Sequence, residues 1–528
     1  MGNNITYELD DDDDEFIQDD RNNELIFDLD SDQYISNALG RMVSNIIGAF
    51  PQPRTDMPVI RKKPDLRTFR HTMLYKEIKA RCGWPANSKR PSERWSLQQG
   101  LSKRENGLVG YPPGSFTANQ QRRVANLFVP NKKEERLMSL ESKVFISKFN
   151  KDGTKLITAC QDAIVRIFDS SKGTYHRINR IKARDVHCIM DIDFSPCGQY
   201  FAYSTWSDYF FVVPVTGSEE LQWIDLNTNL NRAGFFSIRF SPSGSTLIGG
   251  CNDSCVYMCD RETRNKTTIK TQRHQCVDIN AVSYVTDQNS DVFVSGCNNG
   301  MIKLWDVRCL GTYKNSPVGV FIGHLDAITY IDPRNDGNYL LTNSKDQSIK
   351  IWDLRKVTPS NKIRKHTNSP YLNWDYRWDT VPREYYNPTT TLEGDVSIMT
   401  YRGHRVTKSL LRAKFSPLHQ TGQRYIYTGC GTGRIIIYDA LTGNIKEAIE
   451  GHKDIVRDLD WHPVRSEIVS SSWDTHVNLN TFKRNLLLKR PHSEWNPGPL
   501  RRSRRIAHQN GELYDEDDGE DEVRHNHW

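Results

Sequence analysis

Hydrophobic and polar residues alternate in short runs along most of this chain. Residues 279–284 (INAVSY) and 191–194 (DIDF) alternate as half-buried β-strands do. A polar turn such as residues 195–198 (SPCG) follows, and then come two more apolar runs, as at residues 246–250 and 302–306. A further apolar run lies before Gly323-His324. The pattern predicts a unit of four short strands.

The unit recurs seven times between about residue 143 and residue 482. Equivalent positions are Asp169, Pro214, Asp260, Asp306, Asp353, Asp439 and Asn480, separated by 45, 46, 46, 47, 86 and 41 residues. Two consecutive copies end in LWDVR (304–308) and IWDLR (351–355). This period with Trp-Asp endings is typical of a β-propeller whose blades are four-stranded sheets. We expect an all-β, seven-bladed propeller over residues 124–482, with an insertion at about 356–400 that explains the long interval.

When the repeat is divided in this way, the last copy contains three strands and not four. Residues 124–129 (VANLFV) are apolar enough to supply the missing strand from the other end of the ring. Such closure would remove open sheet edges, which promote aggregation.

The segments that flank the ring have a different composition. Residues 1–30 are acidic, and residues 483–528 are basic and then acidic, so both are predicted to be disordered tails. In the extension at residues 31–123, a helix is expected at about 34–47, because Ile35, Leu39, Met42, Val43 and Ile46 form one apolar stripe. This stripe would pack either on the ring or in a groove of a partner.

Composition limits the possible classes of protein. The 528 residues carry a net charge of +6 and 11 cysteines, and no run of about 18 apolar residues exists. With no signal peptide at the N-terminus, we expect an intracellular protein with free thiols and no membrane span. The Gly-rich residues 429–433 lack the Lys of a phosphate-binding loop, so no cofactor is expected.

His324, Ser344 and Asp346 resemble a catalytic triad in composition. Their phase in the repeat favours a structural network instead, in which Asp346 orients His324, and His324 bonds the hydroxyl of Ser344, which accepts the N–H of Trp352. His452, Ser472 and Asp474 repeat most of this set. We therefore expect a binding protein and not an enzyme.

The tail at residues 483–528 contains a basic cluster formed by Arg501, Arg502, Arg504 and Arg505. The cluster predicts a nuclear-import signal; a nucleic-acid-binding arm and a merely solvated tail are the alternatives.

Arg308 and Arg355 end equivalent strands, after Asp306 and Asp353, so both should project from one face of adjacent blades. A guanidinium suits paired hydrogen bonds with a partner's carboxylates or carbonyls. The alternative is a salt bridge that joins neighbouring blades. Residues 374–377 (WDYR) repeat the motif inside the insertion, where we expect Trp374, Tyr376 and Trp378 to pack against the ring.

Paired Trp-Asp-x-Arg motifs behind an amphipathic helix resemble the WD40 substrate receptors of cullin-4 RING ubiquitin ligases. Further strings in residues 126–482 are similar to members of that family: 181–186 (IKARDV), 206–209 (WSDY), 343–347 (NSKDQ), 373–378 (NWDYRW), 399–404 (MTYRGH) and 469–474 (VSSSWD). The flanks resemble the family poorly.

The resemblance implies a receptor that bridges the cullin-4 adaptor and a protein substrate for ubiquitination. Arg308 and Arg355, with Asp306 and Asp353, would contact the adaptor. Leu39 and Val43 of the N-terminal helix would support the adaptor contact. Substrate would bind on the opposite face, near Trp206, Lys345 and Trp473. The family also suggests a stress-response bZIP transcription factor as substrate, a nuclear and partly cytoplasmic location, and no direct role for nucleic acid. The alternative is a scaffold, unrelated to ubiquitin, in a nuclear chromatin or RNA-processing assembly.

Overall fold

The computed structural model describes residues 66–83, 97–107, 114–184, 188–217, 221–228, 230, 233–271, 277–310, 316–365, 374–387 and 391–484. The chain divides into two compact units, Met1–Asp56 and Met57–Trp528. All of the described residues belong to the second unit. The expected helix at residues 34–47 and the basic cluster at 501–505 also lie outside them.

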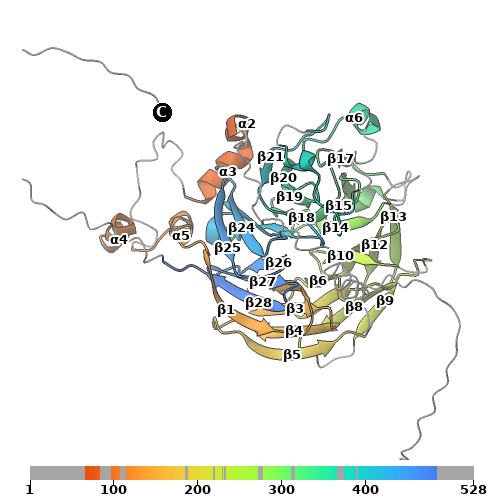
Figure 1. The fold of residues 1–528 in the computed structure, drawn as a ribbon, viewed down its shortest axis with the longest axis horizontal. Helices are drawn as coiled ribbons and strands as arrows, with labels where there is room; N and C mark the ends of the chain where they lie inside the picture. Colours follow the sequence, from red (N-terminus) through yellow and green to blue (C-terminus); the bar gives the residue numbers. More distant parts are fainter. Residues whose placement is uncertain are drawn as a thin grey trace, which may run out of the picture. The chain divides into compact units, whose positions relative to one another are not determined.

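Seven four-stranded antiparallel sheets form the ring of a β-propeller (Figure 1). The first four blades are β2(Val144–Phe149)–β3(Lys155–Cys160)–β4(Ile164–Asp169)–β5(His176–Lys182), β6(Asp191–Phe194)–β7(Tyr200–Ser204)–β8(Tyr209–Pro214)–β9(Gln222–Asp225), β10(Phe235–Phe240)–β11(Thr246–Cys251)–β12(Cys255–Asp260)–β13(Lys266–Lys270) and β14(Ile279–Tyr284)–β15(Val292–Cys297)–β16(Ile302–Asp306)–β17(Gly319–Phe321). The others are β18(Ile328–Pro333)–β19(Tyr339–Ser344)–β20(Ser348–Asp353)–β21(Met399–Arg402), β22(Ala413–Phe415)–β23(Tyr425–Gly429)–β24(Arg434–Asp439)–β25(Ile445–Glu450) and β26(Val456–Trp461)–β27(Glu467–Ser472)–β28(His476–Thr481)–β1(Lys132–Ser139).

The seven-bladed propeller predicted from the repeat is confirmed. Asp169, Pro214, Asp260, Asp306, Asp353 and Asp439 each end the third strand of a blade, and Asn480 is the penultimate residue of β28. The fourth strand expected before Gly323 is β17. The long interval in the fifth blade is the connection between β20 and β21.

Burial decreases from the axis of the ring to its rim. Every residue of the innermost strands β6 and β14 is buried, whereas five of the seven residues of the outer strand β5 are exposed. Glycine in the second strand lets the next blade approach: a Cβ on Gly296 would lie 2.6 Å from Ile328 Cγ2 in β18. Each blade therefore packs closely on the next.

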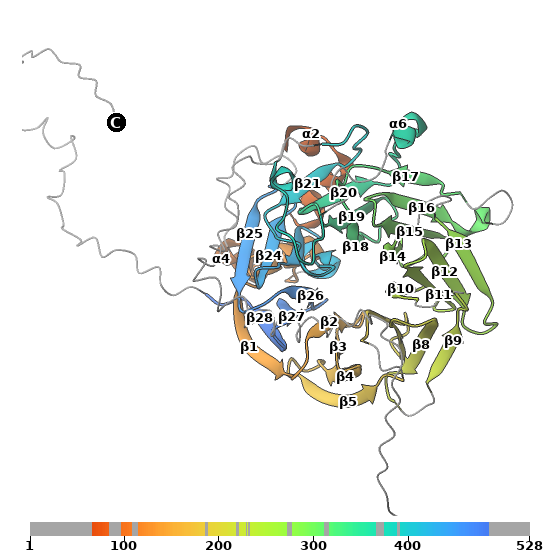
Figure 2. The same cartoon turned by 45° about the vertical axis from the view of Figure 1, so that its right-hand side comes forward.

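A strand from before the first blade completes the last blade, as predicted. The prediction that residues 124–129 form this strand is wrong. Strand β1, which has the sequence KKEERLMS, pairs antiparallel with β28. The first and last strands of the propeller sequence therefore lie side by side (Figure 2). An outer strand is solvent-exposed on much of its surface, so a polar sequence suits that position better than an apolar one. Residues 124–129 instead end a helix and form a turn, in which Val129 is buried and Leu127 is exposed.

Short helices accompany the ring. They are α2(Leu66–Arg70), α3(Met73–Arg81), α4(Leu97–Glu105), α5(Ala118–Ala125), α6(Ser360–Lys365) and α7(Leu418–Thr421), with 3-10 turns η1(Val307–Cys309) and η2(Arg383–Tyr386). Phe69, Leu74 and Ile78 of α2 and α3 are fully buried and pack into one hydrophobic cluster with residues of the fifth and sixth blades. Within the described ranges, no helix has the length and apolar character needed to cross a membrane.

Candidate partner-binding faces

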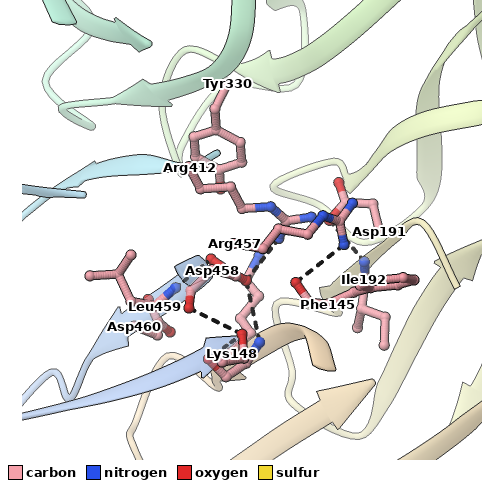
Figure 3. Close-up of polar contacts among 12 residues, drawn as sticks. Phe145, Lys148, Asp191, Ile192, Tyr330, Arg412, Arg457, Asp458, Leu459 and Asp460 are labelled. Atoms are coloured by element: carbon pink, nitrogen blue, oxygen red, sulfur yellow. Dashed lines mark hydrogen bonds and ion pairs between the residues drawn. The ribbon is translucent and has the colours of Figure 1, made fainter. Parts of the chain in front are cut away.

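A buried ion network fills the centre of the ring (Figure 3). Arg412, the residue before β22, donates to Asp191 on β6 (2.7 Å) and to Asp458 on β26 (3.0 Å), and all three side chains are at most 5% exposed. Arg239 on β10 pairs with the other oxygen of Asp191, and Lys414 with Asp458. Burial alone would raise the pKa of Asp191, but Arg239 and Arg412 outweigh it and lower the pKa. The network links four blades across the axis of the ring.

Arg308 and Arg355 emerge on one face of the ring, which we call the fork face, at the ends of the third strands of the fourth and fifth blades. Arg308 donates from Nε (2.9 Å) and Nη2 (2.6 Å) to the two carboxylate oxygens of Asp306. Arg355 donates in the same way to Asp353, at 2.7 Å and 2.9 Å. Their side chains are 66% and 54% exposed. The hydrogen bonds raise the pKa of both arginines, so each guanidinium is a fixed, permanently charged donor.

These ion pairs do not join neighbouring blades. Asp306 and Asp291, the two carboxylates near Arg308, belong to the same blade as Arg308, and Asp353 belongs to the blade of Arg355. The structure therefore lacks the salt bridge between blades that was the alternative role for these arginines, within the described residues.

Helix α3 is linked to Arg355 through a chain of polar contacts. Glu77 accepts from Arg334 Nη1 (2.7 Å), and the guanidinium of Arg334 lies 5.6 Å from the ring centroid of Tyr339. The hydroxyl of Tyr339 in turn accepts from Arg355 Nη2 (2.9 Å). Helix α3 therefore extends the fork face beside Arg355. The sequence contained a signal that we missed, because Leu74, Ile78 and Cys82 recur every four residues behind the N-cap Thr72.

The His–Asp network of the fifth blade is structural, but its hydroxyl is not the predicted one. His324 Nδ1 lies 2.9 Å from Asp346, and its Nε2 lies 2.7 Å from Thr342 Oγ1, which also accepts from Trp352 Nε1 (2.8 Å). Ser344 instead donates to the carbonyl of Asp326. Both hydroxyl side chains lie on the same face of β19 as Trp352 on β20, but Trp352 pairs with Leu340, so Thr342 is two positions from that pair and Ser344 is four.

The seventh blade repeats this arrangement. Ser470, rather than the predicted Ser472, lies 2.9 Å from His452 Nε2. The amide of Asn480 donates to Ser470 (3.0 Å) where the fifth blade has an indole. Within the described part of the chain, no group of three or more His, Cys, Asp or Glu residues is arranged to hold a metal.

The predicted substrate residues lie on the opposite face, which carries the turns between second and third strands. Trp206 is half-buried, with its ring edge-on to Phe236 at 5.5 Å. Trp473 is also half-buried, beneath the ammonium group of Lys143. Lys345 is only 9% exposed, and its Nζ lies 3.9 Å from the ring centroid of Tyr376. Lys345, which was predicted to bind substrate, is therefore covered by the insertion and has little surface left for a substrate.

The insertion crosses from the fork face to this opposite face. Trp374 packs against a cluster that contains Leu325 of the ring and Tyr385 of the insertion, and Tyr376 covers Lys345, as expected of both residues. The expectation that Trp378 packs against the ring is wrong, because this side chain is 64% exposed. Leu39, Val43 and the four tail arginines lie outside the described residues, so their roles stay predictions.

Comparison with known proteins agrees with this architecture. Residues 266–306, 315–353 and 443–479 match the family described as WD domain, G-beta repeat. These segments end at or near the third strands of the fourth, fifth and seventh blades.

Similarity to whole proteins is more specific. The DDB1- and CUL4-associated factor 11 homolog of Caenorhabditis elegans is 36% identical over 421 residues, which cover 76% of this chain and 70% of that protein. The chain belongs to the DDB1- and CUL4-associated factor 11 family. The LEC14B protein of Lithospermum erythrorhizon is also similar, at 34% identity over 64% of this chain and 72% of its own length. The resemblance to this family inferred from the Trp-Asp-x-Arg motifs is therefore confirmed.

Proposed function

We propose that the protein is a substrate receptor of a cullin-4 RING ubiquitin ligase, and that Arg308 and Arg355 bind the adaptor. The observation that carries this proposal is the pair of exposed, immobilised guanidinium groups on adjacent blades of one face. The names of the family's members, which include DDB1 and CUL4, support the identity of the partner.

The geometry of the forks suits a protein partner. Asp306 and Asp353 hold the guanidinium planes before binding, so little side-chain entropy is lost when a partner docks. Two exposed valines, Val318 (58%) and Val357 (45%), lie in the connections that follow Arg308 and Arg355. Apolar side chains beside fixed arginines are the usual composition of an interface core.

The helical extension belongs to the same proposal. Glu77 of α3 reaches Arg355 through Arg334 and Tyr339, so α3 widens the fork face around that arginine. A helix at residues 34–47 that presents Leu39 and Val43 would add an apolar contact to the adaptor.

Substitution of the two arginines tests the proposal. Arg308→Ala and Arg355→Ala should each weaken adaptor binding about 10- to 150-fold, the loss typical of a charge-assisted hydrogen bond. The melting temperature should change by less than about 2 °C, since exposed ion pairs contribute little to stability. Arg180→Ala is the matched control, because Arg180 is an exposed arginine on the outer strand β5. Normal capture of the adaptor by the double variant would refute the assignment.

Two further proposals concern the substrate and the location of the protein. We propose a stress-response bZIP transcription factor as substrate and a nuclear, partly cytoplasmic location, on the strength of the family resemblance. Accumulation of the substrate when Arg308 and Arg355 are replaced would support the first point. The alternative of a nuclear scaffold predicts instead salt-dependent binding of RNA or DNA by the isolated tail at residues 483–528.

A further inference from the structure

The insertion contains a third copy of the arginine fork, on the face opposite to Arg308 and Arg355. Arg377 donates from Nε to Asp375 Oδ1 (3.0 Å) and from Nη2 to Asp375 Oδ2 (2.7 Å). Its backbone N–H also donates to Asp375 Oδ1 (2.9 Å), as the backbone N–H of Arg355 does to Asp353 (3.1 Å). The adaptor proposal does not use this fork.

The fork is part of a closed turn at residues 375–379. The carbonyl of Asp375 accepts from the backbone N–H groups of Trp378 (3.1 Å) and Asp379 (2.8 Å). The carboxylate of Asp379 accepts in return from the backbone N–H of Asp375 (2.9 Å). The acidic groups of the turn therefore point their oxygens at its own donors, and the conformation of Arg377 and Trp378 is set in advance.

The turn is attached to the ring through Tyr376. The ring of Tyr376 covers the ammonium group of Lys345 at 3.9 Å, and its carbonyl accepts from the backbone N–H of Lys408 (2.8 Å). Nearby, Tyr385 of the same insertion donates from its hydroxyl to Asp326 (3.0 Å). Lys345, Lys408 and Asp326 belong to three different connections of the opposite face, so the turn has a broad support.

The outward side of the turn presents one cation and one large apolar group. The side chain of Arg377 is 54% exposed, and Trp378 is 64% exposed, more than any other tryptophan among the exposed hydrophobic residues of the described chain. Lys408 adds a second exposed cation and has no ion pair within the described ranges. Tryptophan and arginine are the residues that most often dominate binding energy when they sit on a rigid support.

We propose that residues 375–379 are a docking site for a substrate segment that carries an aspartate or glutamate next to an aromatic or aliphatic residue. The segment's carboxylate binds Arg377 and its apolar side chain packs on Trp378. The inference rests on the proposed receptor function and names the point where substrate is held. The site lies on the face opposite to the adaptor forks, so substrate and adaptor can bind together.

A phage-displayed library of random 12-residue peptides, selected on the full-length protein, tests the proposal. The wild-type protein should enrich peptides with an acidic residue beside Leu, Phe, Trp or Tyr. Arg377→Ala and Trp378→Ala should each lower the affinity of a selected synthetic peptide at least about ten-fold. Arg377→Glu should change the preference at the acidic position to Lys or Arg, an effect that misfolding cannot produce. Arg383→Ala, which removes an exposed arginine elsewhere in the insertion, is the matched control.

The same variants separate this inference from the receptor proposal. Arg377→Ala and Trp378→Ala should still capture the adaptor, whereas Arg308→Ala with Arg355→Ala should still bind the peptide. An unchanged peptide preference in Arg377→Glu would overturn the docking site and leave the receptor proposal intact. An acidic segment of this chain, such as residues 8–19 (ELDDDDDEFIQD), is the alternative occupant. Tighter peptide binding after removal of residues 1–30 would show that the tail fills the site, and would overturn its assignment to substrate.

Discussion

Replacement of Arg412 by alanine should destabilise the ring far more than replacement of an exposed arginine. Arg412 lies at the centre of the propeller, where it donates to Asp191 on β6 and to Asp458 on β26. Its side chain is 5% exposed, so water cannot take its place without disturbing the inner strands. Each carboxylate keeps one cation after the substitution, Arg239 for Asp191 and Lys414 for Asp458.

The size of the effect follows from these contacts. Removal of one partner from a buried ion pair costs about 3–5 kcal/mol, and the remaining cations favour the lower end of that range. The ring from Lys132 to Thr481 has about 350 residues, so its unfolding entropy near the midpoint is about 0.7 kcal/mol per degree. A loss of about 3 kcal/mol therefore lowers the melting temperature by about 4 °C.

Thermal unfolding followed by circular dichroism at pH 7.5 measures this shift, with Arg355→Ala as the control that loses the same side chain from the surface. The difference between Arg412→Ala and the parent should shrink in acid. Asp191 has a lowered pKa in the folded protein, so its contribution is present above the usual carboxylate pKa and is lost as the pH falls below it. A melting temperature within about 1 °C of the parent at pH 7.5 would show that the network does not hold the blades together.

Three further predictions concern other parts of the chain. Burial raises the pKa of Asp332 to about 7, so the parent protein loses stability as the pH rises from about 4 to 7. The Asp332→Asn variant should avoid this loss, which is worth at most about 4 kcal/mol. The variant should therefore have a higher melting temperature than the parent at pH 8 but not at pH 4. Thr342→Val removes the hydroxyl that hydrogen-bonds to both His324 and Trp352, and it should lower the free energy of unfolding in denaturant by about 2–4 kcal/mol. Ser344→Ala should lower it less, because the Ser344 hydroxyl bonds only one carbonyl and one backbone N–H. Replacement of the four arginines at 501–505 by alanine should reduce the nuclear signal of a fluorescently tagged protein; an unchanged distribution would exclude the cluster as a required import signal.

The repeat was accessible from sequence because it depends on local patterns. Six of the seven third strands end at the position that the Trp-Asp spacing marks, and β28 ends one residue later. The turns that follow the inner strands contain residues suited to tight turns, such as Gly198 with φ of 68°. The paired forks were also accessible, since Asp306 and Arg308 are two residues apart and their hydrogen bonds form within one connection.

Other features depended on which elements become neighbours. The choice between Thr342 and Ser344 was not accessible, because it depends on the register in which β19 pairs with β20 and so on which hydroxyl lies nearer to Trp352. The burial of Lys345 was missed because Tyr376, 31 positions later in the chain, folds over it.

The sequence by itself therefore determined the blade, its period and the arginines at its strand ends, since these follow from alternation, turn chemistry and spacing within one repeat. Only the tertiary structure decided that β1 closes the ring, because a polar outer strand gains its place from hydrogen bonds with β28 and not from its own hydrophobicity. The same is true of Trp378, whose exposure arises because Tyr376 and not Trp378 packs on the ring. Contacts between residues far apart in the chain depend on the packing of whole blades, and no short sequence pattern encodes that packing.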